Sequence, residues 1–125
     1  AQYDKYEPVT GSFVNGKFTS GENIGDLGGI NVAYTALQMY LKDHGNPGKI
    51  SDLTQDQRFF MSWATVWRTK STDKYMTNQV KTDPHSPGYY RSFGPLVNMD
   101  SFQKAFDVKP GDKLYVAPEK RIKIW

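Results

Sequence analysis

The chain has 125 residues, the size of one domain, and 38% of them are hydrophobic, which is enough to build a core. Its three Trp, eight Tyr and seven Phe argue against intrinsic disorder, because disordered segments are usually poor in aromatic residues. Its net charge is +3 and its basic residues are scattered, which argues against the dense basic patch of a nucleic-acid-binding protein. The lack of cysteine excludes disulfides, thiolate metal ligands and a cysteine nucleophile, and no apolar run approaches the ~20 residues of a membrane-spanning helix.

The first expected elements are a short hairpin and a long helix. In Phe13–Thr19 an Asn-Gly pair separates two apolar-polar alternations, which favours a hairpin. Ser20 is a candidate N-cap for the helix that follows, and Gly45 and Pro47 predict where it ends. Between them, apolar residues recur at helical spacing: Ile30, Ala33, Tyr34, Leu37 and Leu41.

A second helix is expected to open at Thr54, because Thr54 and Gln57 have the spacing of a capping box. The apolar residues that follow cover a wide surface of this helix: Phe59, Phe60, Trp63, Ala64, Val66 and Trp67. So wide an apolar surface predicts that the helix is deeply buried.

The rest of the chain predicts two more helices and long irregular segments. A third helix is expected at Asp73–Lys81, and Asp100 with Gln103 has the pattern of another capping box. Prolines and glycines interrupt Thr82–Leu96, so regular structure there is expected to be short. The predicted fold class is therefore mainly α with small β elements.

The stretch GENIGDLGG (Gly21–Gly29) places two acids, Glu22 and Asp26, on one face at the start of the first helix. One interpretation is structural: Glu22 interacts favourably with the helix dipole and Asp26 is solvated. The other is chemical: Glu22 is a zinc ligand, and Asp26 accepts the free ring N–H of a metal-binding histidine.

Two histidines differ in their setting. His44 lies at the end of the first helix, where a histidine usually interacts with the dipole, and no function is assigned to it. His85 lies in a loop constrained by Pro84, Pro87 and Gly88. A solvent-exposed loop histidine is one interpretation, but a loop held this firmly also suits a side chain with a chemical role.

Metal ligand, general base and donor to a developing oxyanion are the three roles open to His85. A catalytic zinc site needs three protein ligands, and two histidines without an H-E-x-x-H motif cannot build a zincin site unaided. The oxyanion role fits better, since it requires only that the ring point at the reacting carbonyl. Arg91 would then bind a substrate carbonyl through its planar fork of donors, the alternative being a surface ion pair.

Three stretches together resemble the neprilysin family of zinc metallopeptidases: GENIGDLGG, TDPHSPGYYR (Thr82–Arg91) and the ending KIW. SDLTQDQRFFMSWATVWR (Ser51–Arg68) is similar to the buried helix that separates the first two motifs. The likeness covers essentially the whole chain. It implies a thermolysin-like, zincin-type catalytic domain and hydrolysis of peptide bonds in oligopeptides.

The resemblance also implies roles for individual residues. Glu22 matches the family's third zinc ligand, and Asp26 matches the aspartate that orients a zinc-binding histidine and is often considered a proton donor. His85 matches the histidine that stabilises the oxyanion, and Arg91 matches the arginine that binds a backbone carbonyl of the substrate. Asp83 fits the motif as a partner for His85.

The family's H-E-x-x-H helix is not found in residues 1–125, so the chain is interpreted as the C-terminal part of the catalytic domain of a bacterial member. The resemblance implies an extracytoplasmic protein, with peptides and the upstream segments of the same polypeptide as partners. The fragment alone is expected to be inactive and to self-associate through exposed apolar surface. Two alternatives are a non-catalytic module that binds peptides or glycans and a degenerate member lacking a zinc-binding histidine.

Overall fold

A computed structural model describes residues 2–124; Trp125, the last residue of the KIW motif, lies outside this range. Helices account for the regular structure of these residues, and β-structure within them is limited to two isolated bridges, Val9–Ser12 and Ile50–Leu53. The elements in chain order are η1 (Tyr3–Lys5), α1 (Ser20–His44), α2 (Gln55–Val66), α3 (Asp73–Thr82), α4 (Gly88–Phe93), η2 (Leu96–Asn98), α5 (Asp100–Ala105) and η3 (Pro118–Lys120).

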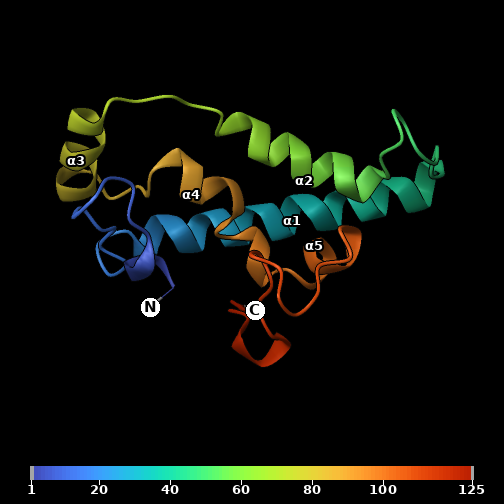
Figure 1. Ribbon diagram of the computed structural model, residues 1–125. Coiled ribbons are helices and arrows are strands. Elements are labelled where there is room, and N and C mark those ends of the chain that lie inside the picture. Colours follow the sequence, from blue (N-terminus) through green and yellow to red (C-terminus); the bar gives the residue numbers. More distant parts are fainter. Residues whose placement is uncertain (1, 125) are drawn as a thin grey trace.

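The long helix α1 forms the axis of the molecule, and α2 runs back along it in the opposite direction (Figure 1). The two helices are joined by ring contacts, in which Tyr34 of α1 stacks on Phe60 of α2 with the centroids 5.3 Å apart. The main core lies where these helices meet η2 and α5; its buried members are Leu27, Ile30, Phe60, Leu96, Met99 and Phe102. This core fixes α1 relative to the chain segment that follows α4.

A second, smaller core attaches the N-terminal segment and α3 to α4. Its buried members are Tyr3, Val14, Val80 and Tyr90. The ring of Tyr6 stacks on that of Tyr90 with centroids 4.5 Å apart. Gly94 is required at this junction, because a Cβ atom there would lie 2.5 Å from the Tyr3 hydroxyl oxygen. The two cores leave the start of α1 facing the loop before α4.

Two local helix signals are confirmed. The side chain of Thr54 accepts a hydrogen bond from the backbone N–H of Gln57, and the Gln57 side chain accepts one from the backbone N–H of Thr54, so the capping box forms. Helix α1 ends at His44, and Gly45 follows with φ of +87°, a conformation that glycine adopts without strain. Thr19, not Ser20, occupies the N-cap position of α1, and neither provides a capping hydrogen bond there.

The predicted hairpin at Phe13–Thr19 is wrong, because this segment forms a turn that leads into α1. The Asn15 side chain accepts from the backbone N–H of Phe18, and the N–H of Gly16 donates to Asp4 Oδ1 at 2.7 Å. These bonds stabilise the turn and attach it to η1.

The predicted capping box at Asp100 is also wrong, although a helix does begin at this residue. Asp100 pairs with Arg121 instead. The Gln103 side chain donates to the carbonyl oxygens of Val97 and Leu114. Both side chains therefore tie α5 to other segments, and the short helix begins without a side-chain cap.

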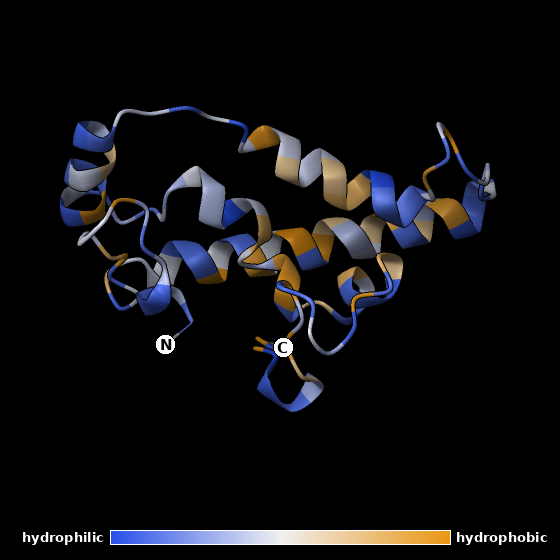
Figure 2. Cartoon of the chain, viewed as in Figure 1, coloured by the Kyte–Doolittle hydropathy of each residue, from blue (hydrophilic) through white to orange (hydrophobic). Residues whose placement is uncertain are grey.

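The expectation that α2 is deeply buried fails for this chain. Figure 2 shows apolar residues along most of α2 and in the middle of α1. Phe60 is the one residue of α2 that is buried, whereas Met61 and Val66 on the same helix are exposed. On α1, Val32 and Met39 are exposed as well. Apolar surface thus remains on the outside of both helices.

Candidate functional site

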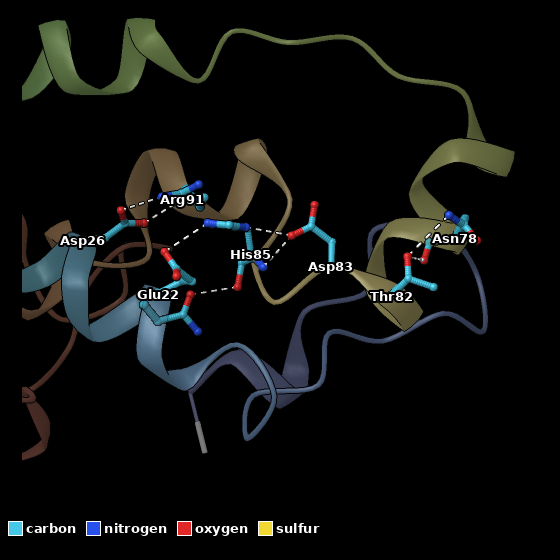
Figure 3. A network of polar contacts seen from close by, with 9 residues as sticks. Glu22, Asp26, Asn78, Thr82, Asp83, His85 and Arg91 are labelled. Atoms are coloured by element: carbon cyan, nitrogen blue, oxygen red, sulfur yellow. Dashed lines mark hydrogen bonds and ion pairs between the residues drawn. The ribbon is translucent and has the colours of Figure 1, made fainter.

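Two segments that are far apart in sequence meet at one end of the molecule. The first turns of α1 supply Glu22 and Asp26, and the loop before α4, with α4 itself, supplies Asp83, His85 and Arg91 (Figure 3). The Pro87 carbonyl accepts the N–H groups of Tyr90 and Arg91, so α4 starts directly after the loop. All four residues predicted to form the site, together with Asp83, lie in this cluster.

The first part of the cluster is an exposed row of three side chains with His85 at its centre. His85 Nε2 lies 3.0 Å from Glu22 Oε2, and His85 Nδ1 lies 2.7 Å from Asp83 Oδ1. The side chains are 42% exposed for His85, 46% for Glu22 and 38% for Asp83. A neutral imidazole can donate to one carboxylate only, and an imidazolium can donate to both. The ring is therefore a proton donor held between two acceptors.

The Asp83 carboxylate holds the loop as well as the ring. Its Oδ1 accepts the backbone N–H of His85 at 2.9 Å, a short-range turn typical of aspartate. This backbone hydrogen bond, followed by the bond and charge of the His85 ring, lowers the pKa of Asp83 below its ordinary value. Asp83 is therefore a carboxylate at neutral pH and accepts a proton-bearing Nδ1.

The second part of the cluster is a largely buried ion pair. Arg91 donates from Nε to Asp26 Oδ2 and from Nη2 to Asp26 Oδ1, each at 2.7 Å. The side chains are 16% and 9% exposed. Asp26 is therefore not the solvated acid of the structural interpretation, and Arg91 is not a surface arginine.

Two tryptophans fix the position of Arg91: Trp63 in α2 and Trp67, which directly follows this helix. The Arg91 guanidinium carbon lies 3.9 Å from the centroid of the Trp67 ring, a cation–π arrangement. The Trp63 indole N–H donates to the backbone carbonyl of Arg91 at 3.0 Å. The sequence indicated both tryptophans as apolar residues of a helix face only, and their contact with Arg91 was not predicted.

A buried chain of side-chain hydrogen bonds lies directly behind the exposed row. The Ser86 hydroxyl donates to Asn23 Oδ1 at 2.8 Å, and Asn23 Nδ2 donates to the Thr19 hydroxyl at 2.9 Å. All three residues are buried. Sequence reasoning missed this chain, although Asn23 and Ser86 are the immediate neighbours of Glu22 and His85 in the two motifs.

The donor set fits part of a zinc site. Within residues 2–124, no group of three or more His, Asp or Glu side chains is placed to hold a metal ion. Glu22 nevertheless presents an accessible carboxylate, and carboxylate oxygen is an ordinary zinc ligand. Glu22 can therefore serve as one ligand of a zinc site.

Outside the cluster, His44 lies in the last turn of α1, where its Nδ1 is 3.1 Å from the carbonyl oxygen of Tyr40. It is exposed and takes no part in the site. None of the helices formed by residues 2–124 combines the length and the apolarity needed to cross a membrane.

Comparison with known proteins supplies the family. Human neprilysin is 41% identical over 119 residues, which cover 92% of this chain and 15% of neprilysin. The neutral endopeptidase of Lactococcus lactis is 40% identical over 125 residues, all of this chain and 18% of that protein. The crystal structure of the Mycobacterium tuberculosis zinc metalloprotease Zmp1 with an inhibitor superposes with a TM-score of 0.93 at 44% identity, over 99% of this chain and 20% of that one.

These matches confirm the predicted resemblance and the predicted fold class, mainly helical and zincin-like. The chain spans less than a fifth of the length of the two curated relatives and a fifth of the solved one. The model of peptidase family M13 matches residues 1–122. The chain belongs to peptidase family M13.

Proposed function

We propose that this chain supplies one part of the catalytic centre of a zinc-dependent metalloendopeptidase that hydrolyses oligopeptides. Glu22 is assigned as a zinc ligand, His85 as the donor to the oxyanion, Arg91 as the substrate-binding residue, and Asp26 as the acid that orients a zinc-binding histidine. The observation that carries the proposal is the 3.0 Å approach of His85 Nε2 to Glu22 Oε2, which joins two motifs in a chain of a peptidase family.

Glu22 is suited to metal binding because its carboxylate is accessible and lies in the first turn of α1. The remaining ligands are proposed to come from residues outside these 125, in line with the greater length of the relatives. Zinc, when bound, would supply Lewis-acid polarisation and a water of lowered pKa.

His85 is suited to donate a hydrogen bond to a negative oxygen. Asp83 accepts from Nδ1, which fixes the orientation of the ring and leaves Nε2 directed away from the loop toward Glu22. In the imidazolium form the ring carries a proton on Nδ1 for Asp83 and another on Nε2, and Nε2 would then stabilise the oxygen of a peptide carbonyl as its charge develops. Asp83 thus acts through His85.

Arg91 keeps donors for a substrate after binding Asp26. Nε and one hydrogen of Nη2 are used by the carboxylate, whereas no residue between 2 and 124 accepts a hydrogen bond from Nη1. A guanidinium with Nη1 free can bind a backbone carbonyl. Each oxygen of Asp26 retains a second lone pair, so Asp26 can accept a ring N–H in addition to the bonds from Arg91.

The test uses the full-length polypeptide that contains this chain. Zinc content and hydrolysis of a fluorogenic peptide are measured for the wild type, Glu22→Gln and Glu119→Gln. Glu119 is an exposed acid of η3 and serves as the matched control. We expect Glu22→Gln to lose both zinc and hydrolysis and Glu119→Gln to keep both. Full zinc content in Glu22→Gln would overturn the assignment of Glu22 as a ligand. Hydrolysis that persists in Glu22→Gln would favour a peptidase centre at another place.

The 125-residue chain by itself is proposed to bind zinc weakly and to turn over no peptide, because it carries one of the proposed ligands. Calorimetric titration with zinc and a peptidase assay with and without chelator test this directly. Nanomolar affinity, or hydrolysis that a chelator abolishes, would contradict it. Binding of peptides or glycans without any hydrolysis by the full-length protein would favour the module alternative.

The exposed apolar residues of α1 and α2 are proposed to pack on other segments of the same polypeptide. Met61 and Val66 of α2 and Val32 and Met39 of α1 are such residues. The isolated chain should then self-associate, with a sedimentation coefficient that rises with concentration.

An extracytoplasmic location is part of the proposal, and protease accessibility in intact cells tests it.

A further inference from the structure

The buried contact between Ser86 and Asn23 links the two motifs behind the candidate site. We propose that Asn23 and Ser86 are positioning residues, which hold the His85 loop against the first turn of α1 so that His85 and Glu22 converge. This inference rests on the function proposed above, because it assigns His85 the oxyanion role.

The contact has the properties of a fixed attachment. Ser86 is 1% exposed and Asn23 is 9% exposed, and their side chains join positions 63 residues apart. The donors follow one direction: the Ser86 hydroxyl donates to Asn23, Asn23 donates to the Thr19 hydroxyl, and Thr19 donates to the backbone carbonyl of Asn15. This sequence leaves each of the three polar side chains satisfied and defines which end of the Asn23 amide faces the loop.

The exposed row cannot provide this attachment. The contact between Glu22 and His85 joins two side chains that are more than two-fifths exposed. Ion pairs of this kind contribute little net stability, because solvent screens them and two flexible side chains must be ordered. Loss of the Ser86 hydroxyl, in contrast, would leave the buried Asn23 oxygen without its partner.

The positions in the sequence explain how a buried bond can govern an exposed ring. Ser86 directly follows His85, and Asn23 directly follows Glu22. The two inward-facing polar residues therefore fix the backbone at the points from which the two outward-facing side chains extend. Within the loop, Asp83 fixes only the local turn and the ring, so its contacts do not reach α1.

The first experiment measures kcat, KM and zinc content of the full-length polypeptide. We expect Ser86→Ala to lower kcat about ten- to hundred-fold, as is usual for residues that orient functional side chains. KM and zinc content should change little, because Glu22 and Arg91 stay in place on their own helices. Ser92→Ala is the matched control, since the Ser92 hydroxyl donates only within its own helix, to the carbonyl of Tyr89.

The same substitution in a His85→Ala background separates positioning from general structure. If Ser86 acts through His85, Ser86→Ala should have no further effect on kcat once the ring is removed. A loss of the same factor in both backgrounds, or no loss in either, would overturn the inference. Should Ser86→Ala fail to fold, Ser86→Cys keeps the size of the side chain with a weak donor and takes its place.

The second measurement is amide hydrogen exchange over residues 83–87, which does not depend on catalysis. The His85 N–H is held by Asp83, and we expect Ser86→Ala to raise its exchange rate while Ser92→Ala does not. Unchanged exchange would contradict the attachment. If the wild type shows no zinc-dependent hydrolysis, the proposed function fails, and the exchange rates still decide whether Asn23 and Ser86 hold the loop.

Discussion

The candidate site has two halves that differ in their exposure to solvent. Arg91 and Asp26 form a bidentate pair that is largely buried and covered on one side by Trp67. Glu22 and His85 meet at the surface, where both side chains are well exposed. The two halves are adjacent and carry the same kinds of charge.

The difference indicates how the two halves divide structure and chemistry. A buried charge is costly without its partner, so the pair of Arg91 and Asp26 is part of what holds α4 to α1. An exposed pair contributes little to folding, so the contact between Glu22 and His85 can be replaced by contacts with a metal ion or a substrate.

Asp26→Ala should lower the free energy of unfolding by about 3–5 kcal/mol, because it leaves the Arg91 guanidinium buried and unpaired. Urea unfolding monitored by tryptophan fluorescence measures the loss. The double variant Asp26→Leu with Arg91→Met should be less destabilised than Asp26→Ala, since no unpaired charge remains. A loss below about 1 kcal/mol for Asp26→Ala would show that this pair contributes no more to stability than an exposed ion pair does.

His85→Ala should lower kcat of the full-length polypeptide by about 10²–10³-fold, the usual effect of removing one donor to an oxyanion. Its free energy of unfolding should change by less than about 1 kcal/mol, because the ring is exposed. His44→Ala, at an exposed position outside the cluster, is the control and should keep kcat. Comparable losses for the two variants would remove the special role of His85.

Glu22→Gln should change the free energy of unfolding of the metal-free protein by at most about 1 kcal/mol. The change should be smaller at high salt than at low salt, because salt screens an exposed ion pair. A loss comparable to that of Asp26→Ala would show that the two halves are not distinct, and the comparison of the two urea midpoints is the measurement.

Asp83 should give the smallest effect, seen as a pH dependence of stability. Its pKa is lowered in the folded protein by the hydrogen bond from the His85 N–H, so its contribution is present above the ordinary aspartate pKa of about 3.9 and is lost as the pH falls through the lower folded value. Asp83→Asn should therefore reduce the loss of stability that the protein shows as the pH is lowered. An unchanged loss, recorded by thermal melting between about pH 2 and pH 6, would contradict this.

Local signals predicted the helices well where they depend on local contacts. The capping box at Thr54 formed, and α1 ended before Gly45, because both features use backbone groups within a few residues. The similar pattern at Asp100 failed, because Arg121 binds the carboxylate instead. A pattern of residue types does not show which distant partner will compete for a side chain.

The same limit applies to the site. The two motifs predicted four site residues, which lie with Asp83 in one cluster, and the family that the motifs resemble is the one whose model matches the chain. The partner of Asp26 was not predictable, since Arg91 is 65 residues away in the sequence. Trp63 and Trp67 were assigned only to the apolar surface of a helix, because their contacts with Arg91 also join residues that are distant in the sequence.

The sequence by itself determined the helical class, the family and the residue types of the site, because these depend on composition, local spacing and motifs. Only the tertiary structure decided that Asp26 is buried against Arg91 while Glu22 remains at the surface. It also decided that Asn23 and Ser86 join the motifs from behind. These outcomes depend on which side chains meet after α1 and α4 pack together, and burial then fixes the cost of separating them.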